Sequence, residues 1–407
     1  MAGGGLLQFL PLTFPSANHN LGCLSGQPAN YSTNQHCLFL INRASGPPSL
    51  FAGYHYPYPY PFLAMRPTLL LLALLAMLPR LAADDSARRY LGKTDGWFAS
   101  AEAKKVADII LTYQADAGGW PKNTDTVSQP YSGDRSKLQP TFDNKGTVDE
   151  LRFMARMVNA TKAEAYRNSF DRGLAYVLKA QYANGGWPQF FPLRKGYYDR
   201  ITFNDGAMVR VLELVREVGR DERYAFIDAK MRESCRQAFD RGIACILKCQ
   251  IVVDGQPAVW CAQHDEKTFA PAKARSYELP SFSGSESVGI VRLLMSLENP
   301  SAEIRASIEG AVTWFESHRI KGQRLETTKT LLGGKDLVMV PDPTAPDLWA
   351  RFYDLKAGAP YVSDRDGIPK PRLADIGHER RNGYSWFGEY PRDLLAKDYP
   401  AWKKQLK

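Results

Sequence analysis

The stretch QYANGGWPQFFP at 181–192 repeats, with small changes, the stretch QADAGGWPKNTD at 114–125. Each copy begins at the glutamine that ends an amphipathic run, and a third such run, GIACILKCQ, ends at Gln250. The three glutamines, at 114, 181 and 250, lie 67 and 69 residues apart. Apolar residues at helical spacing precede each of them, so each run predicts an amphipathic helix that leads into a loop.

A second motif follows each loop and also recurs. It begins at Thr141, Thr202 and Ser281 with the sequences TFDNKGTVDELRFM, TFNDGAMVRVLELV and SFSGSESVGIVRLL. Each copy opens with a hydroxyl residue and Phe, passes through short polar residues or Gly, and becomes helical. The repeated unit is therefore a helix, a loop, a helix start and a second helix, stated three times between about residues 100 and 300.

Helix-pair repeats of this kind bury their apolar faces against their neighbours. The sequence thus predicts an all-α-dominated single domain of repeated helix hairpins in an α/α toroid-like arrangement, with a central cleft, short β pieces and long loops on one rim. The Gly-Gly pair before each tryptophan predicts a tight turn, so we interpret Trp120 and Trp187 as packing residues rather than sugar-stacking ones.

The first part of the chain differs in composition, since residues 1–83 contain no Asp, Glu or Lys. The stretch MRPTLLLLALLAMLPRLAADD from Met65 has a basic start, an apolar run and small residues. It resembles a secretory signal peptide, with a run too short to span a membrane. We therefore expect 1–64 to be a spurious or disordered extension, 65–83 a signal peptide, and 84–407 the mature domain, secreted or periplasmic. The alternative is a genuine leader followed by an apolar N-terminal helix.

The mature chain stays basic after removal of this leader. It keeps 49 Lys and Arg (52 minus three) against 43 Asp and Glu, a net charge of about +6. A basic secreted protein suits an anionic partner such as an acidic polysaccharide, although nucleic acid or anionic lipid would fit the charge equally well.

Four cysteines remain in the mature chain, and an oxidising compartment would permit a disulfide between them. Cys245 and Cys249 are four residues apart in a predicted helix, so we expect both to face the core as small apolar groups. The pattern Cys261-x-x-His264 supplies half of a zinc site, which makes zinc a weaker alternative. Whether any of Cys235, Cys245, Cys249 and Cys261 form a disulfide stays open.

Two acid–amide pairs occupy matching places in the repeats, Asp143–Asn144 and Asn204–Asp205. Such residues are good N-caps, and we expect at least one member of each pair to cap the helix that follows. Capping does not explain two adjacent pairs beside two Gly-Gly-Trp-Pro loops. Hard oxygen ligands from two loops, completed by water and substrate, are what Ca²⁺ prefers, so the pairs also predict a weak calcium site. The third repeat offers Glu286 alone, which argues against a symmetric third ligand.

A second concentration of charge lies in the C-terminal half of the chain. Arginines beside aromatic residues or glycine occur in KARSYE, WARFYD, VSDRDG and HERRNGYSW, at Arg275, Arg351, Arg365, Arg380 and Arg381. Arginine grips carboxylates with two parallel hydrogen bonds. These residues therefore predict a groove for a substrate that carries repeated carboxylates.

These motifs, taken in order, resemble the family 10 polysaccharide lyases, which are pectate lyases. The matching stretches are GGWPKNTD, TFDNKGTVDELRFM, NGGWPQFFP, ITFNDGAMVRVLELV, CAQHDEKTFAPAKARSYELPS, SGSESVGIVRLLMSL, WARFYDL and SDRDG, from about Tyr90 to about Pro400. The resemblance implies an α/α toroid-like fold with a wide central cleft, and calcium-dependent β-elimination of polygalacturonate. The expected partner is that polysaccharide rather than nucleic acid or membrane, and we expect a monomer.

The resemblance also implies roles for individual residues. Asp205 matches the calcium-site aspartate, Asp143 and Asn144 the essential acid–amide pair at the substrate, and Arg365 the arginine proposed as catalytic base. The residues expected to bind substrate are Arg275, Arg351 and Arg380, with Arg381 adjacent to the last of them.

An arginine base is chemically unusual, because a pKa above about 12 keeps the side chain protonated. Asp364 and Asp366 flank Arg365 and favour its protonated form, whereas Ca²⁺ and neighbouring arginines disfavour it. Arg275 is the next basic group to test if Arg365 is not the base.

Two other functions remain open at this point. A catalytically inactive pectin-binding protein would keep the groove without the chemistry. Triterpene cyclases share the pattern Gln-x-x-x-Gly-x-Trp and the toroid, but they need an Asp-rich initiating motif that this sequence lacks.

Overall fold

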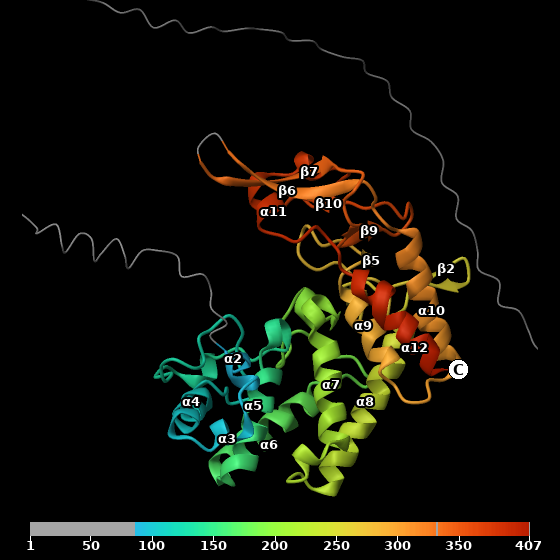
Figure 1. Ribbon diagram of the computed structural model, residues 1–407. Helices are drawn as coiled ribbons and strands as arrows, with labels where there is room; N and C mark the ends of the chain where they lie inside the picture. The colour runs from blue at the N-terminus through green and yellow to red at the C-terminus, as the bar shows by residue number, and fades with distance from the viewer. Residues whose placement is uncertain (1–85, 331–332, 407) are drawn as a thin grey trace, which may run out of the picture. The chain divides into compact units, whose positions relative to one another are not determined.

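The helices follow the sequence repeats in the computed structural model, which describes residues 86–330 and 333–406 (Figure 1). In each repeat a first helix leads through a loop to a second one, and consecutive helices α5 and α6, α7 and α8, and α9 and α10 pack together. The repeat helices are α4 (Ala101–Thr112), α5 (Val148–Thr161), α6 (Glu164–Lys179), α7 (Ala207–Arg220), α8 (Ala229–Cys249), α9 (Glu286–Met295) and α10 (Ala302–Ser317). The shorter helices are α2 (Arg88–Leu91), α3 (Asp95–Phe98), α11 (His378–Asn382) and α12 (Tyr399–Gln405).

The strands are antiparallel pairs, and most are two or three residues long. The short pairs are β1 (Ile201–Thr202) with β4 (Gln263–His264), β2 (Val252–Val253) with β3 (Gln256–Pro257), β5 (Ser281–Ser283) with β9 (Phe352–Asp354), β8 (Trp349–Ala350) with β12 (Phe387–Gly388), and β10 (Val362–Ser363) with β11 (Pro369–Lys370). The longer hairpin of β6 (Gln323–Lys329) and β7 (Lys335–Pro341) was not predicted. A helix-rich fold with short β pieces is thus confirmed.

Each repeated glutamine joins its own loop to the helix of the next unit. The side-chain Nε2 of Gln114 donates to Gly118 O at 2.7 Å and to Ser169 O at 2.9 Å. Gln181 makes the same two kinds of contact, to Gly185 O in its loop and to Ala238 O in the next helix. Gln250 does so with Ala258 O and Ser307 O. The spacing of the glutamines in the sequence therefore reflects one hydrogen-bonded joint used three times.

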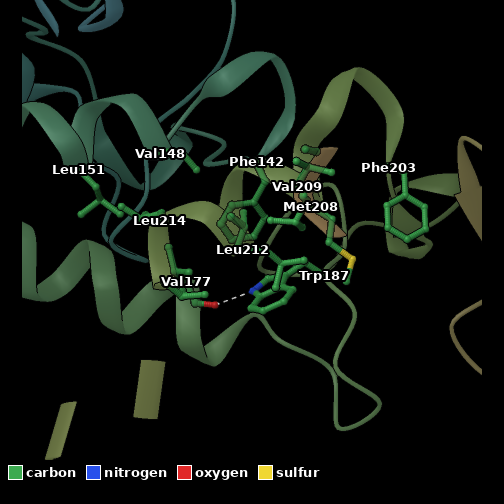
Figure 2. Close-up of a cluster of buried hydrophobic side chains, with 14 of the residues drawn as sticks. Phe142, Val148, Leu151, Val177, Trp187, Phe203, Met208, Val209, Leu212 and Leu214 are labelled. Carbon is green, nitrogen blue, oxygen red and sulfur yellow. Dashed lines mark hydrogen bonds between the residues drawn. The ribbon is translucent and has the colours of Figure 1, made fainter. Parts of the chain in front are cut away.

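The repeated tryptophans hold the other end of each loop. Trp120 and Trp187 are fully buried, and each indole N–H donates to a carbonyl oxygen 10 residues earlier, Ile110 O and Val177 O, both at 2.9 Å. Figure 2 shows the Trp187 contact within the core, between α6 and α7. The interpretation of both tryptophans as packing residues is confirmed.

Other tryptophans make the same kind of contact. Trp260 bonds Ile246 O at 2.8 Å, and Trp349 bonds Phe315 O at 2.8 Å across 34 residues. The longer spacing arises because β6 and β7 are inserted between α10 and Trp349. The same kind of tryptophan contact therefore recurs beyond the first two loops.

Two glycines let the repeat helices approach closely. A Cβ on Gly242 of α8 would lie 2.3 Å from Leu212, and one on Gly173 of α6 would lie 2.6 Å from Leu151. Real Cβ contacts are never this short, so neither position accepts a side chain without movement of its neighbours.

The N-cap prediction for the acid–amide pairs is wrong. Helices α5 and α7 begin at Val148 and Ala207, and neither start has a side-chain cap. Asn144 and Asp205 instead adopt the left-handed conformation, with φ of 47° and 49°, inside 3₁₀ turns that precede the helices. Asn and Asp tolerate this conformation better than other non-glycine residues, so their side chains are free for other contacts.

The structure confirms the core placement of two cysteines and gives no support to a zinc site in the described chain. Cys245 and Cys249 are buried in the core, as predicted, and all four cysteines of the described chain are free thiols. The zinc alternative finds no support at His264, because both ring nitrogens are used within its own loop, by Cys261 N at 3.0 Å and Phe269 O at 2.7 Å. Burial also lowers the pKa of His264 to about 4, which leaves it neutral.

Parts of the predicted domain organisation lie outside the described residues. The extension at 1–64 and the signal peptide at 65–83 belong to this part of the chain. Across 86–330 and 333–406, no helix has the length and apolar character needed to cross a membrane.

Candidate active site

Asp143 is the point where two of the repeated loops converge. Its carboxylate accepts hydrogen bonds from Lys122, from Gln189 and from the backbone N–H of Asn144. Lys122 and Gln189 occupy the same place, two residues after the tryptophan, in the first and second loops. Asn144 continues the contact by donating to Asn123 Oδ1 at 2.9 Å.

Asp205 belongs to the matching turn of the second repeat and is more open. Its side chain is 41% exposed, and its carboxylate accepts from Asn204 Nδ2 at 2.7 Å and from Arg351 Nη2 at 3.0 Å. The same Arg351 nitrogen donates to Glu286, whose side chain is 2% exposed and also accepts from Ser283. The third repeat thus does bring its acid, Glu286, to the same arginine nitrogen as Asp205.

The oxygen atoms around Arg351 fit the chemistry of a calcium site in part. Across the described ranges, no three His, Cys, Asp or Glu side chains are placed to hold a metal ion by themselves. Asp205, Glu286 and the amide oxygen of Asn204 nevertheless all contact one positively charged nitrogen, the last at 3.3 Å. Ca²⁺ takes six to eight such hard oxygen ligands, so water and an acidic substrate would have to complete the set.

Arg210 of α7 lies between the two acid–amide turns. It donates to the backbone oxygen of Asp205. Burial lowers the pKa of Arg210, and the negative charges of Asp149, Asp205 and Asp143 oppose this shift. The two turns also contact each other directly. The structure therefore brings the Asp143 and Asp205 motifs together, as the sequence predicted.

Arg275 and Arg351 meet at a tyrosine ring. Arg275 forms an ion pair with Glu278, with Nε to Oε2 at 2.8 Å, and its Cζ lies 5.1 Å from the ring centre of Tyr277 and 5.6 Å from that of Tyr384. Arg351 also contacts Tyr384, with its Cζ 4.8 Å from the centre of the Tyr384 ring. Arg275 is thus one aromatic ring away from the arginine that holds Asp205.

Arg380 and Arg365 join the same group through Glu379. Arg380 Cζ lies 4.6 Å from the Tyr277 ring centre, and its guanidinium donates to Glu379. Arg365, with 66% of its side chain exposed, donates to the same carboxylate at 2.9 and 3.1 Å. These bonds, from Arg380 first and then Arg365, lower the pKa of Glu379 to about 2. Because the pKa is lowered, the ion pairs are present at neutral pH and are lost only as the pH falls toward 2.

Two of these arginines are held protonated in the free protein. Burial alone would lower the pKa of Arg275, but hydrogen bonding to Glu278 raises it above the ordinary value. Burial opposes ionisation of Arg351 too, and the charge of Glu286 raises its pKa well above the usual range. Both side chains therefore offer positive charge for an acidic ligand.

The neighbouring Arg381 serves the fold. It forms a two-pronged ion pair with Asp336 on β7, at 2.7 and 2.8 Å, and His378 contacts Lys335 O at 2.8 Å. The inserted hairpin is thereby fastened to α11, the helix that carries Arg380. Of the two adjacent arginines, it is Arg380 that faces the other predicted site residues.

A large cavity in the described part of the chain lies elsewhere. It has a volume of about 680 Å³ and is lined mainly by apolar side chains of β7 and the segment after β11, including Leu337, Met339 and Leu373. Of the arginines predicted to line a substrate groove only Arg381 borders it, and neither acid–amide pair does. The grouping of charged residues, and not the size of a cavity, locates the candidate site.

Several residues of this site were not singled out from the sequence. Lys122 and Gln189 could have been found from their matching positions after Trp-Pro in the two loops. Glu278 could have been found from its position three residues after Arg275, within reach of a local ion pair. Nothing in the sequence indicates that Tyr277 and Tyr384 stand between the arginines, because they are far apart in the chain.

A family model described as pectic acid lyase matches residues 114–395, and the chain belongs to this family. The chain is similar to the family 10 polysaccharide lyase from Cellvibrio cellulosa, with 34% identity, a TM-score of 0.65, and coverage of 75% of this chain and 95% of that one.

A mutant of the Cellvibrio cellulosa lyase in complex with trigalacturonic acid is similar to the same degree. It shares 32% identity and a TM-score of 0.66, with coverage of 78% of this chain and 97% of that one. No curated protein matches the chain. The predicted resemblance to family 10 polysaccharide lyases is confirmed, and it favours a lyase over a triterpene cyclase.

Proposed function

We propose that the protein is a secreted, monomeric pectate lyase that cleaves de-esterified polygalacturonate by calcium-dependent β-elimination, giving 4,5-unsaturated oligogalacturonides. The observation that carries the proposal is the convergence of Asp143, the Asp205–Glu286–Arg351 group and the further arginines. The complex of the similar lyase with trigalacturonic acid supports the same substrate class. Secretion would depend on the leader at 65–83. We also propose that the helix pairs close into the toroid-like ring, with the substrate in its cleft.

Calcium would be held by Asp205, with Glu286 and the amide oxygen of Asn204 as neighbouring donors. When bound, it supplies positive charge beside the uronate carboxylate. Asp205 would exchange its contact with Arg351 for one with the ion, and Arg351 and Arg380 would bind carboxylates of the chain. Asp143 would act on the substrate side by orienting Lys122, which it holds in an ion pair.

The reaction itself is a proton abstraction followed by bond cleavage. An arginine takes the C5 proton, the C5–H electron pair forms the C4–C5 double bond, and the C4–O pair leaves with the glycosidic oxygen, which takes a proton from water. Positive charge from arginine side chains, fixed where negative charge develops, stabilises the transition state. Because the base must be deprotonated, activity should increase toward alkaline pH.

Two arginines are candidates for the base, Arg365 first and Arg275 second. Arg365, assigned by resemblance, is mostly exposed and shares its one acidic partner with Arg380. Arg275 is fixed by Glu278 and by two tyrosine rings. It is linked to Asp205 through Tyr384 and Arg351. The ion pair with Glu278 raises the pKa of Arg275 and keeps it protonated, which suits carboxylate binding, so Arg365 remains the base that we propose.

Replacement of Asp205 by Asn is expected to weaken calcium saturation without unfolding the protein. The amide keeps the left-handed backbone conformation and loses the negative charge. We expect the half-saturating calcium concentration for polygalacturonate cleavage to rise at least about tenfold, with a change in unfolding free energy below about 1 kcal/mol.

The matched control for this experiment is Asp254→Asn. Asp254 is also a left-handed aspartate, with φ of 50°, but it lies in the β2–β3 turn. Its replacement should leave calcium dependence unchanged. A metal role for Asp205 would be refuted by an Asp205→Asn variant with a lowered melting temperature and unaltered calcium dependence.

A further inference from the structure

The loop that follows the second Gly-Gly-Trp-Pro sequence connects the two halves of the candidate site. At its start, Gln189 donates to the carboxylate of Asp143, and its backbone N–H bonds Tyr198 O at 3.0 Å. At its end, burial and Tyr198 raise the pKa of Tyr197, and the positive charge of Arg275 counteracts this. The loop therefore begins at Asp143 and carries Tyr197 within electrostatic reach of Arg275.

The loop carries an arginine stacked on aromatic rings. Arg194 Cζ lies 4.7 Å from the ring centres of both Phe190 and Tyr198. The same Phe190 ring has Lys122 Nζ at 5.7 Å, and Lys122 is the ion-pair partner of Asp143. Arg194 is thus separated from the Asp143 pair by one aromatic ring.

The charge of Arg194 is not neutralised by the surrounding protein. Its guanidinium donates to the amide oxygen of Gln139 at 2.8 Å, and none of the ion pairs in the described part of the chain includes it. Arg194 is half-buried, and Lys195 beside it is exposed. By contrast, Arg275, Arg351 and Arg380 each have a carboxylate partner. The guanidinium of Arg194 is therefore available to pair with an anionic ligand.

We propose that Arg194, with Phe190 and Tyr198, forms an additional subsite that binds a uronate unit flanking the cleavage position. The guanidinium would pair with the uronate carboxylate, held in place by its stacking on two rings. The half-buried ring of Tyr198 would offer an apolar surface to the sugar. This proposal rests on the proposed function, since it supplies a further position for the same acidic chain.

The test compares substrates of different length on four proteins: the wild type, Arg194→Ala, Arg194→Lys and Arg241→Ala. Arg241 is the matched control, because it is an exposed arginine that donates to a glutamine, Gln181 Oε1 at 2.6 Å, on the repeat helix α8. We expect kcat/KM of Arg194→Ala to fall about tenfold on polygalacturonate and clearly less on trigalacturonate. Arg194→Lys should recover part of the loss, and Arg241→Ala should match the wild type on both substrates.

An equal fall on the two substrates, or no fall on either, would overturn the subsite. If the wild type cleaves neither substrate, the proposed function fails, and calorimetric binding of polygalacturonate to the wild type and to Arg194→Ala then decides the subsite separately. Weaker binding of the variant supports it, and equal binding contradicts it.

Discussion

Exchange of the base arginine for lysine is expected to lower turnover by about 10²–10⁴, the range found for loss of a general base. Lysine keeps the positive charge, so attraction of the uronate carboxylates largely survives and binding should fall only modestly. It loses the planar fork and changes the reach of the side chain, and catalysis is sensitive to misplacement by about 1 Å.

Two variants locate this effect, Arg365→Lys and Arg275→Lys, assayed at saturating polygalacturonate and calcium and at alkaline pH. One of them should lose turnover in the stated range, and the other should change mainly KM, as loss of uniform substrate binding does. The family resemblance assigns the loss to Arg365, and the ion pair that keeps Arg275 protonated assigns Arg275 to substrate binding. If both variants keep more than about a tenth of turnover, neither arginine is the base.

Replacement of Arg351 by Ala is expected to destabilise the fold by about 3–5 kcal/mol as well as to abolish activity. The side chains of Arg351 and Glu286 are only 10% and 2% exposed, so the variant would leave the Glu286 charge buried without its arginine. Removal of one partner of a buried pair costs far more than removal of the whole pair. Denaturant unfolding of the purified variants measures this difference.

A double variant separates the two roles of Arg351. In Arg351→Met with Glu286→Leu, both charges are replaced by apolar groups, so most of the lost stability should return while activity stays absent. Arg392→Ala is the control, because Arg392 pairs with Glu389 on the surface and should cost no more than about 1 kcal/mol. Equal unfolding free energies for Arg351→Ala and Arg392→Ala would show that the buried pair is not important for stability.

The helix pairs could be predicted because each depends on residues that recur at a fixed spacing. The glutamine side chains bond their own loop and the next helix, so they are visible as a period in the sequence. The Trp349 contact escaped prediction because the inserted hairpin stretches its spacing to 34 residues. The toroid closure and the central cleft stay predictions.

The candidate site could be predicted only residue by residue. Asp143, Asp205 and the arginines stand out by their neighbours in the sequence, but their partners come from distant segments. Glu286 meets Arg351 across 65 residues, and no local pattern indicates this contact. The N-cap interpretation of Asp205 failed for a local reason, since the same residue type that caps helices also adopts the left-handed conformation.

The most direct test of the account is the ultraviolet absorbance of unsaturated uronide formed from polygalacturonate by the wild-type protein. The account predicts a steady rise in absorbance with added calcium, no rise after treatment with a chelator, and recovery when calcium is restored. A protein that binds polygalacturonate but forms no unsaturated product at any calcium concentration would be an inactive binding protein. Unsaturated product formed at an equal rate with and without the chelator would keep the lyase and contradict its dependence on calcium.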